Sequence, residues 1–437
     1  MTRYQNFFFE SYEFNHQTFV LSLKYSFDHQ QYFTETIQFP VSDKKYNTEL
    51  VDRLSYFLWI MAGISYYKAF YPAKIQFTRS EDVPSKLWAD FFAKSYRHGL
   101  GEFFVVNDLP VPSKIEFPFS AECDLHPIEI DSYGAFLPIG GGKDSLVSAY
   151  LLQTAGVEFD SFFVNPKPLQ LNCAEPLLGG SYAVTRTIDK ALFALNEQGA
   201  LNGHVPISAI WAGIMLVSAA LEKKQYVVLS NEASANVGNL QKDGLAVNHQ
   251  YSKSLEFETD LQNLVAQTIT NSITYFSLLR PLSEWQIMDL FAKHCWPNFK
   301  NLFASCNKNF KESAAKQSEI PSGNWCGNCS KCAFVFLMLA AKVPRAELIA
   351  VFGENLFEKS SLKQVFEALC GVAGQKPFEC VGEIAECRLA AVAAQKEFDE
   401  VAFLVSQFAV PNEELFNTLS PHKIPSTLFE KVFPKNY

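Results

Sequence analysis

Residues 136–155, FLPIGGGKDSLVSAYLLQTA, predict a buried strand that passes through a glycine-rich turn directly into a helix. Three consecutive glycines let the backbone turn sharply and bring its N–H groups close to an anion. They are Gly140, Gly141 and Gly142. The N-terminus of the following helix favours negative charge at the same point. Lys143 adds a positive charge, Asp144 can hold a divalent cation, and Ser145 can donate another hydrogen bond.

The order of residues in this turn differs from the Walker pattern, which needs four residues between its first glycine and the Gly-Lys-Ser/Thr end. The turn resembles the pyrophosphate loop S-G-G-x-D-S of the ATP pyrophosphatases, which cleave ATP to AMP and pyrophosphate. Five of the six positions agree, and Gly140 replaces the first serine. The alternative is an ordinary glycine-rich turn. The glycines, the Asp-Ser pair and both flanking elements together favour the pyrophosphate loop.

Strands and helices alternate between residues 119 and 340, which is typical of a parallel sheet covered on both faces. We expect an α/β fold with a pyrophosphate-loop (adenine nucleotide alpha-hydrolase-like) domain at 119–340. An α+β domain at 1–118 precedes it, and a mostly helical region at 341–437 follows. The expected strands are 19–25, 32–39, 135–139, 159–164, 226–230 and 274–279. The expected helices are 48–69, 144–155, 181–198, 206–223 and 283–294.

Polar residues follow the predicted strands, and ligands of such sheets bind beyond the carboxyl ends of strands. Asn165 follows one strand, Asn231 and Glu232 follow another, and Arg280 follows a third. We predict that these residues line a nucleotide site, with Arg280 as an anion ligand. For Asn231 and Glu232, a capped turn is the alternative.

Three further segments carry candidates for proton transfer or substrate contact. His249 and Lys253 lie in VNHQYSKSLEFE (247–258), where acids are close in sequence. A solvated loop that leads into a helix fits this segment equally well. Glu102 lies in GLGEFF, and Cys380 lies in QKPFECVGE (375–383), which suits an active-site loop or a structural turn.

Four cysteines have the spacing of a metal site. Cys326, Cys329 and Cys332 are separated by two-residue gaps, and Cys306 lies 20 residues before Cys326. Four thiolates satisfy tetrahedral zinc, so we predict structural zinc at this cluster. An iron–sulfur cluster is the competitor, although ferredoxins carry a further Cys-Pro that is absent after Cys332. Reduced, unliganded thiols are the third possibility.

Composition limits the class of protein. The net charge of −9 argues against a broad nucleic-acid surface, and no stretch reaches the length of a membrane helix. Polar and acidic residues interrupt the first 14 positions, where a signal peptide needs an apolar core. Ten cysteines in such a chain indicate a reducing cytoplasm rather than disulfides. The oligomeric state is left open.

Six segments, in this order, resemble the family of UDP-N-acetylmuramoyl-L-alanyl-L-glutamate epimerases, often called MurL. They are IGGGKDS, SNEASANVGN, NHQYSKSLEFE, RPLSEW, WCGNCSKC and KPFECVGE, and they span roughly residues 139–383. The resemblance implies a UDP-MurNAc-dipeptide substrate, UDP-MurNAc-L-Ala-L-Glu, in peptidoglycan precursor synthesis. It also implies ATP and Mg²⁺, with inversion of the terminal L-Glu to D-Glu through an acyl-adenylate and release of AMP and pyrophosphate.

The resemblance also implies roles for the candidates. Gly140–Gly142 and Ser145 would cradle pyrophosphate, Lys143 would stabilise its charge, and Asp144 would help to hold Mg²⁺. Proton transfer or substrate contact would fall to the remaining candidates. They are Glu102, His249, Lys253 and Cys380. Which two of them face each other across Cα stays open.

Three other functions are compatible with the loop. A ligase of the 7-cyano-7-deazaguanine synthase type would share both the loop and a cysteine knuckle, but it leaves the first 118 residues and those from 341 unexplained. A tRNA-modifying enzyme would use the same loop chemistry, and the negative net charge weighs against it. A non-catalytic nucleotide sensor would not need the intact Lys143-Asp144-Ser145 sequence.

Overall fold

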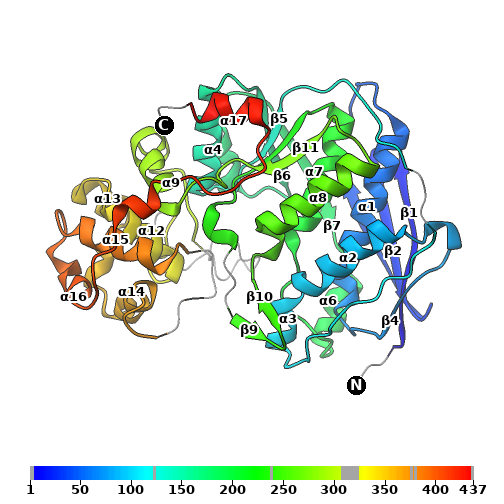
Figure 1. Cartoon of the computed structure of the whole chain (residues 1–437), viewed down its shortest axis with the longest axis horizontal. Coiled ribbons are helices and arrows are strands. Elements are labelled where there is room, and N and C mark those ends of the chain that lie inside the picture. Colours follow the sequence, from blue (N-terminus) through cyan, green and yellow to red (C-terminus); the bar gives the residue numbers. More distant parts are fainter. Residues whose placement is uncertain are drawn as a thin grey trace.

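The computed structural model describes residues 4–121, 125–236, 240–306, 324–374, 377 and 381–434. Its centre is a nine-stranded sheet with the order β11-β8-β5-β6-β7-β3-β2-β1-β4 (Figure 1). The strands are β1 (Asn6–Asn15), β2 (Val20–Phe27), β3 (Gln31–Gln38), β4 (Lys74–Phe77), β5 (Ala135–Pro138), β6 (Phe159–Val164), β7 (Ser181–Thr187), β8 (Tyr226–Leu229) and β11 (Thr274–Ser277). A separate hairpin consists of β9 (Leu240–Lys242) and β10 (Leu245–Val247).

Helices cover both faces of the sheet and form a cluster at one end of the molecule. Those before residue 300 are α1 (Thr48–Tyr67), α2 (Lys86–Gly99), α3 (Gly101–Val106), α4 (Lys143–Thr154), α5 (Pro168–Ala174), α6 (Lys190–Glu197), α7 (Ile207–Glu222), α8 (Leu255–Thr268), α9 (Glu284–Leu290) and α10 (Trp296–Phe299). Those after it are α12 (Ser330–Ala340), α13 (Arg345–Phe352), α14 (Lys363–Leu369), α15 (Ile384–Ala394), α16 (Ala402–Val405) and α17 (Ser426–Val432).

The predicted parallel sheet is confirmed for five neighbouring strands, from β11 through β8, β5 and β6 to β7. Its central strand is buried on both faces. Phe136 packs into one hydrophobic core with α1 and α7, whereas Ala135 and Leu137 pack into a second core with α4, α9 and α12. Because both faces of such a strand are buried, its sequence is a continuous run of apolar residues.

The N-terminal strands join the same sheet. β3 pairs antiparallel with β7, so the sheet is continuous across residue 118, where the sequence predicted a domain boundary. The buried carboxylate of Glu35 on β3 accepts hydrogen bonds from the Arg186 guanidinium on β7, at 2.7 and 3.2 Å. A bidentate ion pair of this kind strengthens and orients the junction. The proposed limits of the three domains stay predictions.

The predicted helix at 181–198 is wrong in its first half. Residues Ser181–Thr187 form β7, and α6 begins only at Lys190. The segment SYAVTRT alternates strictly between exposed and buried side chains, which is the period of a strand. The sequence reading also missed β1, whose pairing with β2 and β4 places it near the far edge of the sheet.

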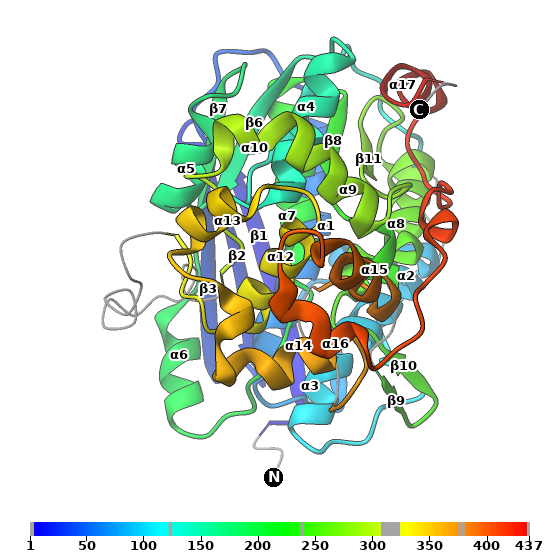
Figure 2. The same ribbon diagram turned by 90° about the vertical axis from the view of Figure 1, so that its left-hand side faces the viewer.

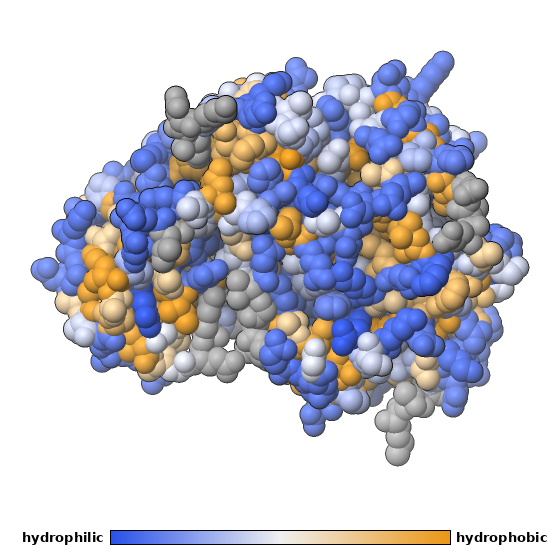
Figure 3. Space-filling model, viewed as in Figure 1, coloured by the Kyte–Doolittle hydropathy of each residue, from blue (hydrophilic) through white to orange (hydrophobic). Residues whose placement is uncertain are grey.

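The helices α12 to α16 gather at the end of the molecule opposite β1 and β4 (Figure 1), and they stand in front of the sheet when viewed from that side (Figure 2). The mostly helical C-terminal region is therefore confirmed for the described residues. The chain then returns to the central layer, where α17 contacts α4. None of the described helices combines the length and the apolar character needed to cross a bilayer. Hydrophilic residues cover most of the face shown in Figure 3.

Candidate active site

A cavity of about 370 Å³ opens at the carboxyl ends of β5 and β8. This is the edge of a parallel sheet at which ligands bind. Six residues singled out from the sequence line it: Gly140, Gly142, Asp144, Ser145, Asn231 and Lys253. Other parts of the chain contribute Pro138, Ser208, Trp211, Met215, Leu229, Ser230, Ala304, Ser305 and Lys331.

The glycine turn lies between β5 and α4, as the sequence predicted. Gly141 has a φ of +83°, a left-handed conformation that glycine adopts without strain. Its carbonyl accepts a hydrogen bond from the Ala304 N–H at 2.8 Å. A Cβ on Gly142 would come within 2.8 Å of the Ser305 Oγ. The backbone conformation therefore favours glycine at Gly141, whereas a side chain at Gly142 would require Ser305 to shift.

Lys143 lies beneath the cavity and not in its lining. Its Nζ forms ion pairs with Asp144 Oδ1 at 2.5 Å and Glu284 Oε2 at 2.7 Å, and its side chain is 4% exposed. Burial lowers the pKa of Lys143, but the two carboxylates outweigh this effect and hold that pKa above its usual value. The pKa of Glu284 is raised, first by burial and then by the carboxylates of Asp144 and Glu232. Lys143 is therefore an ammonium ion that fixes the position of Asp144.

Asn231 is the predicted rim residue that lines the cavity, and its Nδ2 donates to Ser277 Oγ at 2.9 Å. Asn165 instead joins the ends of β6 and β7, because its Nδ2 donates to the Arg186 carbonyl at 2.7 Å. Arg280 is fully buried behind the cavity and donates to the Glu232 carbonyl at 2.7 Å. The structure thus places Asn165, Glu232 and Arg280 outside the cavity lining.

Glu102 on α3 and His249 in the loop after β10 lie side by side, and His204 joins them from the segment before α7. One Glu102 oxygen accepts a hydrogen bond from His249 Nδ1 and lies 3.8 Å from His204 Nδ1. The His249 hydrogen bond lowers the pKa of Glu102, so this group is a carboxylate. Two imidazoles and one carboxylate can exchange protons or bind a divalent cation.

Lys253 connects this group to the cavity. Lys253 lines the cavity, and its charge helps to lower the pKa of His204. Burial is the larger cause of that lowering, and His249 is the next. The backbone carbonyl of Lys253 accepts a hydrogen bond from Arg280, so the buried arginine fixes this loop. Lys253 therefore lies between the glycine turn and the Glu102–His204–His249 group.

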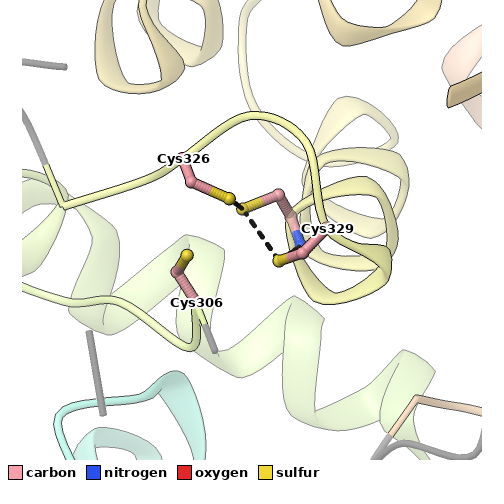
Figure 4. Close-up of side chains that lie close together, drawn as sticks. Cys306, Cys326 and Cys329 are labelled. Carbon is pink, nitrogen blue, oxygen red and sulfur yellow. Dashed lines mark hydrogen bonds between the residues drawn. The ribbon is translucent and has the colours of Figure 1, made fainter. Parts of the chain in front are cut away.

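The four predicted cysteines converge on one point. The Sγ atoms of Cys306, Cys326, Cys329 and Cys332 all lie within 4.8 Å of one another. Cys329 and Cys332 are separated by 3.4 Å, and Cys326 and Cys332 by 3.7 Å. Figure 4 shows the sulfurs of Cys306, Cys326 and Cys329 turned toward each other. Four converging sulfurs, three of them on buried residues, form a donor set that fits tetrahedral zinc.

Several residues of the site were missed by the sequence analysis. His204 and Trp211 flank the start of α7, which reads as a buried apolar helix, and Lys331 lies inside the cysteine knuckle. Glu284 follows the predicted N-cap Ser283, where an acid is expected for capping alone. A single sequence gives no signal that distinguishes a site residue from a core or capping residue at these positions. Cys380, another candidate, lies outside the described residues.

Comparison with known proteins gives the class of this α/β protein. The sequence model of the MurL N-terminal domain matches residues 1–278, and that of the MurL C-terminal domain matches residues 302–417. The chain therefore belongs to the MurL family.

Three relatives named UDP-N-acetyl-α-D-muramoyl-L-alanyl-L-glutamate epimerase are similar over most of their length. The protein of Xanthomonas oryzae pv. oryzae is 36% identical over 437 residues, covering 95% of this chain and 94% of the relative. That of a Micromonospora species is 34% identical, covering 91% and 90%. That of Salinispora tropica is 36% identical, covering 88% and 84%. The names of these relatives describe isomerases.

Proposed function

We propose that this protein is an ATP-dependent epimerase that inverts the terminal L-Glu of UDP-MurNAc-L-Ala-L-Glu, a step in peptidoglycan precursor synthesis. The observation that carries the proposal is one cavity, which is bordered by the GGGKDS turn and connected through Lys253 to the Glu102–His204–His249 group. The GGGKDS turn suits phosphate chemistry, and the Glu102–His204–His249 group suits proton transfer. The names of the three relatives support the substrate.

Activation of the carboxylate explains why both parts are needed. Removing the α-proton of a carboxylate creates a dianion, which is very unstable. If an oxygen of the α-carboxylate of the terminal L-Glu attacks the α-phosphorus of ATP, the bond between the α-phosphorus and the bridging oxygen breaks, and pyrophosphate leaves. The resulting acyl-adenylate has no carboxylate charge, so its Cα–H is more acidic. A base takes the proton from one face, an acid returns one to the other face, and water releases AMP.

The turn supplies the contacts for the phosphates. Gly140, Gly142 and Ser145 line the cavity, so backbone N–H groups of the turn and the Ser145 hydroxyl suit the departing pyrophosphate. Asp144 faces the cavity and is the carboxylate that would hold Mg²⁺, an ion that prefers oxygen ligands. The ammonium of Lys143 acts from beneath, because its contact with Asp144 fixes that carboxylate.

An apolar recess beside the turn suits the adenine ring. Trp211 and Met215 line both the main cavity and an adjoining hollow that includes Ile139, Phe162 and Phe163. The Trp211 side chain is 39% exposed, which leaves its indole accessible to a base. Aromatic side chains stack on nucleotide bases with about 1–3 kcal/mol per base.

Proton transfer falls to the Glu102–His204–His249 group. An imidazole held by a carboxylate at Nδ1 keeps Nε2 as its basic nitrogen. His249 is therefore our candidate for one of the two proton-transfer residues, and Glu102 is its positioning residue. Lys253 and Cys380 stay candidates for the opposite face or for substrate contact.

The experiment that tests this function is incubation with ATP, Mg²⁺ and UDP-MurNAc-L-Ala-L-Glu in deuterated water. We expect D-Glu with deuterium at Cα and one AMP per turnover. D144A should abolish AMP formation, whereas D43A, which removes an exposed carboxylate outside the cavity, should act as wild type. Inversion without deuterium would refute the deprotonation mechanism, and full turnover by D144A would refute the role of the turn.

A further inference from the structure

The cysteine cluster forms part of the cavity wall. Ala304 and Ser305, which line the cavity, immediately precede Cys306. Lys331, which also lines it, lies between Cys329 and Cys332. Both segments that supply thiols therefore also supply a polar residue to the cavity lining.

The segment before Cys306 is also bound directly to the glycine turn. The Ala304 N–H donates to the Gly141 carbonyl at 2.8 Å. The Cys173 thiol donates to the Leu302 carbonyl at 3.2 Å and lies 3.7 Å from the Gly141 carbonyl. A shift of the cluster would therefore move Ser305 relative to the turn.

Lys331 is the cation that this wall offers to the cavity. Within the described residues it forms no ion pair, whereas Lys143 is already paired with Asp144 and Glu284 beneath the turn. A pyrophosphate group brought into the cavity carries several negative charges. A lysine binds such a group as a point charge, and a charge-assisted contact of this kind is stronger than a neutral hydrogen bond.

We propose that Lys331 binds the pyrophosphate part of the nucleotide and that the tetrathiolate cluster, when it holds its metal, positions Lys331 and Ser305 against the glycine turn. The inference rests on the proposed function, because it assumes a nucleotide in this cavity. It adds a phosphate-binding residue and gives the cysteine cluster a role in the site. Binding at the cluster and binding in the cavity are then thermodynamically linked, each strengthening the other.

The first test measures the affinity of the metal-loaded protein for Mg²⁺-pyrophosphate, AMP and α,β-methylene-ATP by calorimetry. K331Q should weaken pyrophosphate and analogue binding about tenfold, the size of one charged contact, and AMP binding less than twofold. K331R should restore most of the affinity. K396Q removes an exposed lysine outside the cavity and should bind as wild type. Metal content and circular dichroism verify that each variant is folded and loaded.

The second test measures the linkage without requiring a stable metal-free protein. Pyrophosphate should slow extraction of the metal by a chelator in the wild type and should have no such effect in K331Q. Unchanged pyrophosphate affinity in K331Q would overturn the role of Lys331. Equal extraction rates with and without pyrophosphate in the wild type would overturn the positioning role of the cluster. Wild-type protein that binds neither pyrophosphate nor the analogue would overturn the proposed function itself.

Discussion

The carboxylate of Glu102 accepts a hydrogen bond from Nδ1 of His249, although 147 positions separate the two residues. The same contact lowers the pKa of Glu102, so the oxygen accepts and the ring nitrogen donates. In the neutral ring, this contact fixes the tautomer of His249 with its hydrogen on Nδ1. The ring of His204 lies beside that of His249, with centroids 4.6 Å apart and planes tilted by 46°.

Loss of this hydrogen bond should impair proton transfer at Cα but not formation of the acyl-adenylate. We expect E102Q and H249Q to keep ATP–pyrophosphate exchange within about threefold of wild type, because neither residue lines the cavity. Deuterium incorporation at Cα should fall about 10²- to 10⁴-fold in H249Q, the usual contribution of a general acid or base. H126Q removes an exposed imidazole and serves as the control. Equal losses of exchange and of deuterium incorporation would contradict the assignment.

His204 should make the folded state sensitive to mild acid. Burial and the nearby His249 lower the pKa of His204 from its usual 6.5 to about 4. Between these values the unfolded chain binds more protons than the folded one, so the free energy of unfolding falls as the pH is lowered. Between pH 7 and 4.5, the free energy of unfolding of H204Q, measured by urea unfolding, should decrease by about 2 kcal/mol less than that of the wild type. In the control H126Q, the free energy of unfolding should decrease over this pH range as much as in the wild type.

Glu102 should act at lower pH in the same experiment. Its pKa is lowered from 4.5, so its contribution to stability is present above that value and is lost as the pH falls below it. E102Q should therefore alter the profile mainly below pH ~4.5, whereas H204Q should alter it mainly above that pH. If E102Q and H204Q altered the free energy of unfolding over the same pH range, the result would contradict separate titration of Glu102 and His204.

Residues that act through local sequence were predictable, and those that act through distant contacts were not. The strand, the three glycines and α4 are contiguous, so their pattern alone specifies the turn. By contrast, α6 was predicted to start too early, because one buried position of β7 is a charged residue, Arg186, whose partner Glu35 lies 151 positions earlier. Likewise, Lys143 was assigned to the cavity from its place in the motif. Glu284, which holds it beneath the turn, comes from a helix 141 positions later (284 − 143).

The neighbouring glycines of the turn should respond differently to alanine. G141A should lower stability by about 1–2 kcal/mol, because a Cβ is strained at a φ of +83° and would meet Leu169 at 3.2 Å. G140A should leave stability unchanged, since no atom lies within 4 Å of its Cβ position. Because Gly140 lines the cavity, its new methyl group should still weaken pyrophosphate binding. Thermal unfolding and calorimetry check the two effects separately.

Replacement of one thiol should remove the metal from the cysteine cluster. Cys329 is the least buried of the four, so C329S disturbs core packing least. We expect the wild type to contain one zinc per chain by elemental analysis, and C329S to lose it and unfold at a lower temperature, because structural zinc contributes directly to folding. C370A, at a buried cysteine outside the cluster, should keep its zinc even if it is less stable. Iron in place of zinc would favour an iron–sulfur cluster, and no metal in the wild type would mean that the four thiols are unliganded.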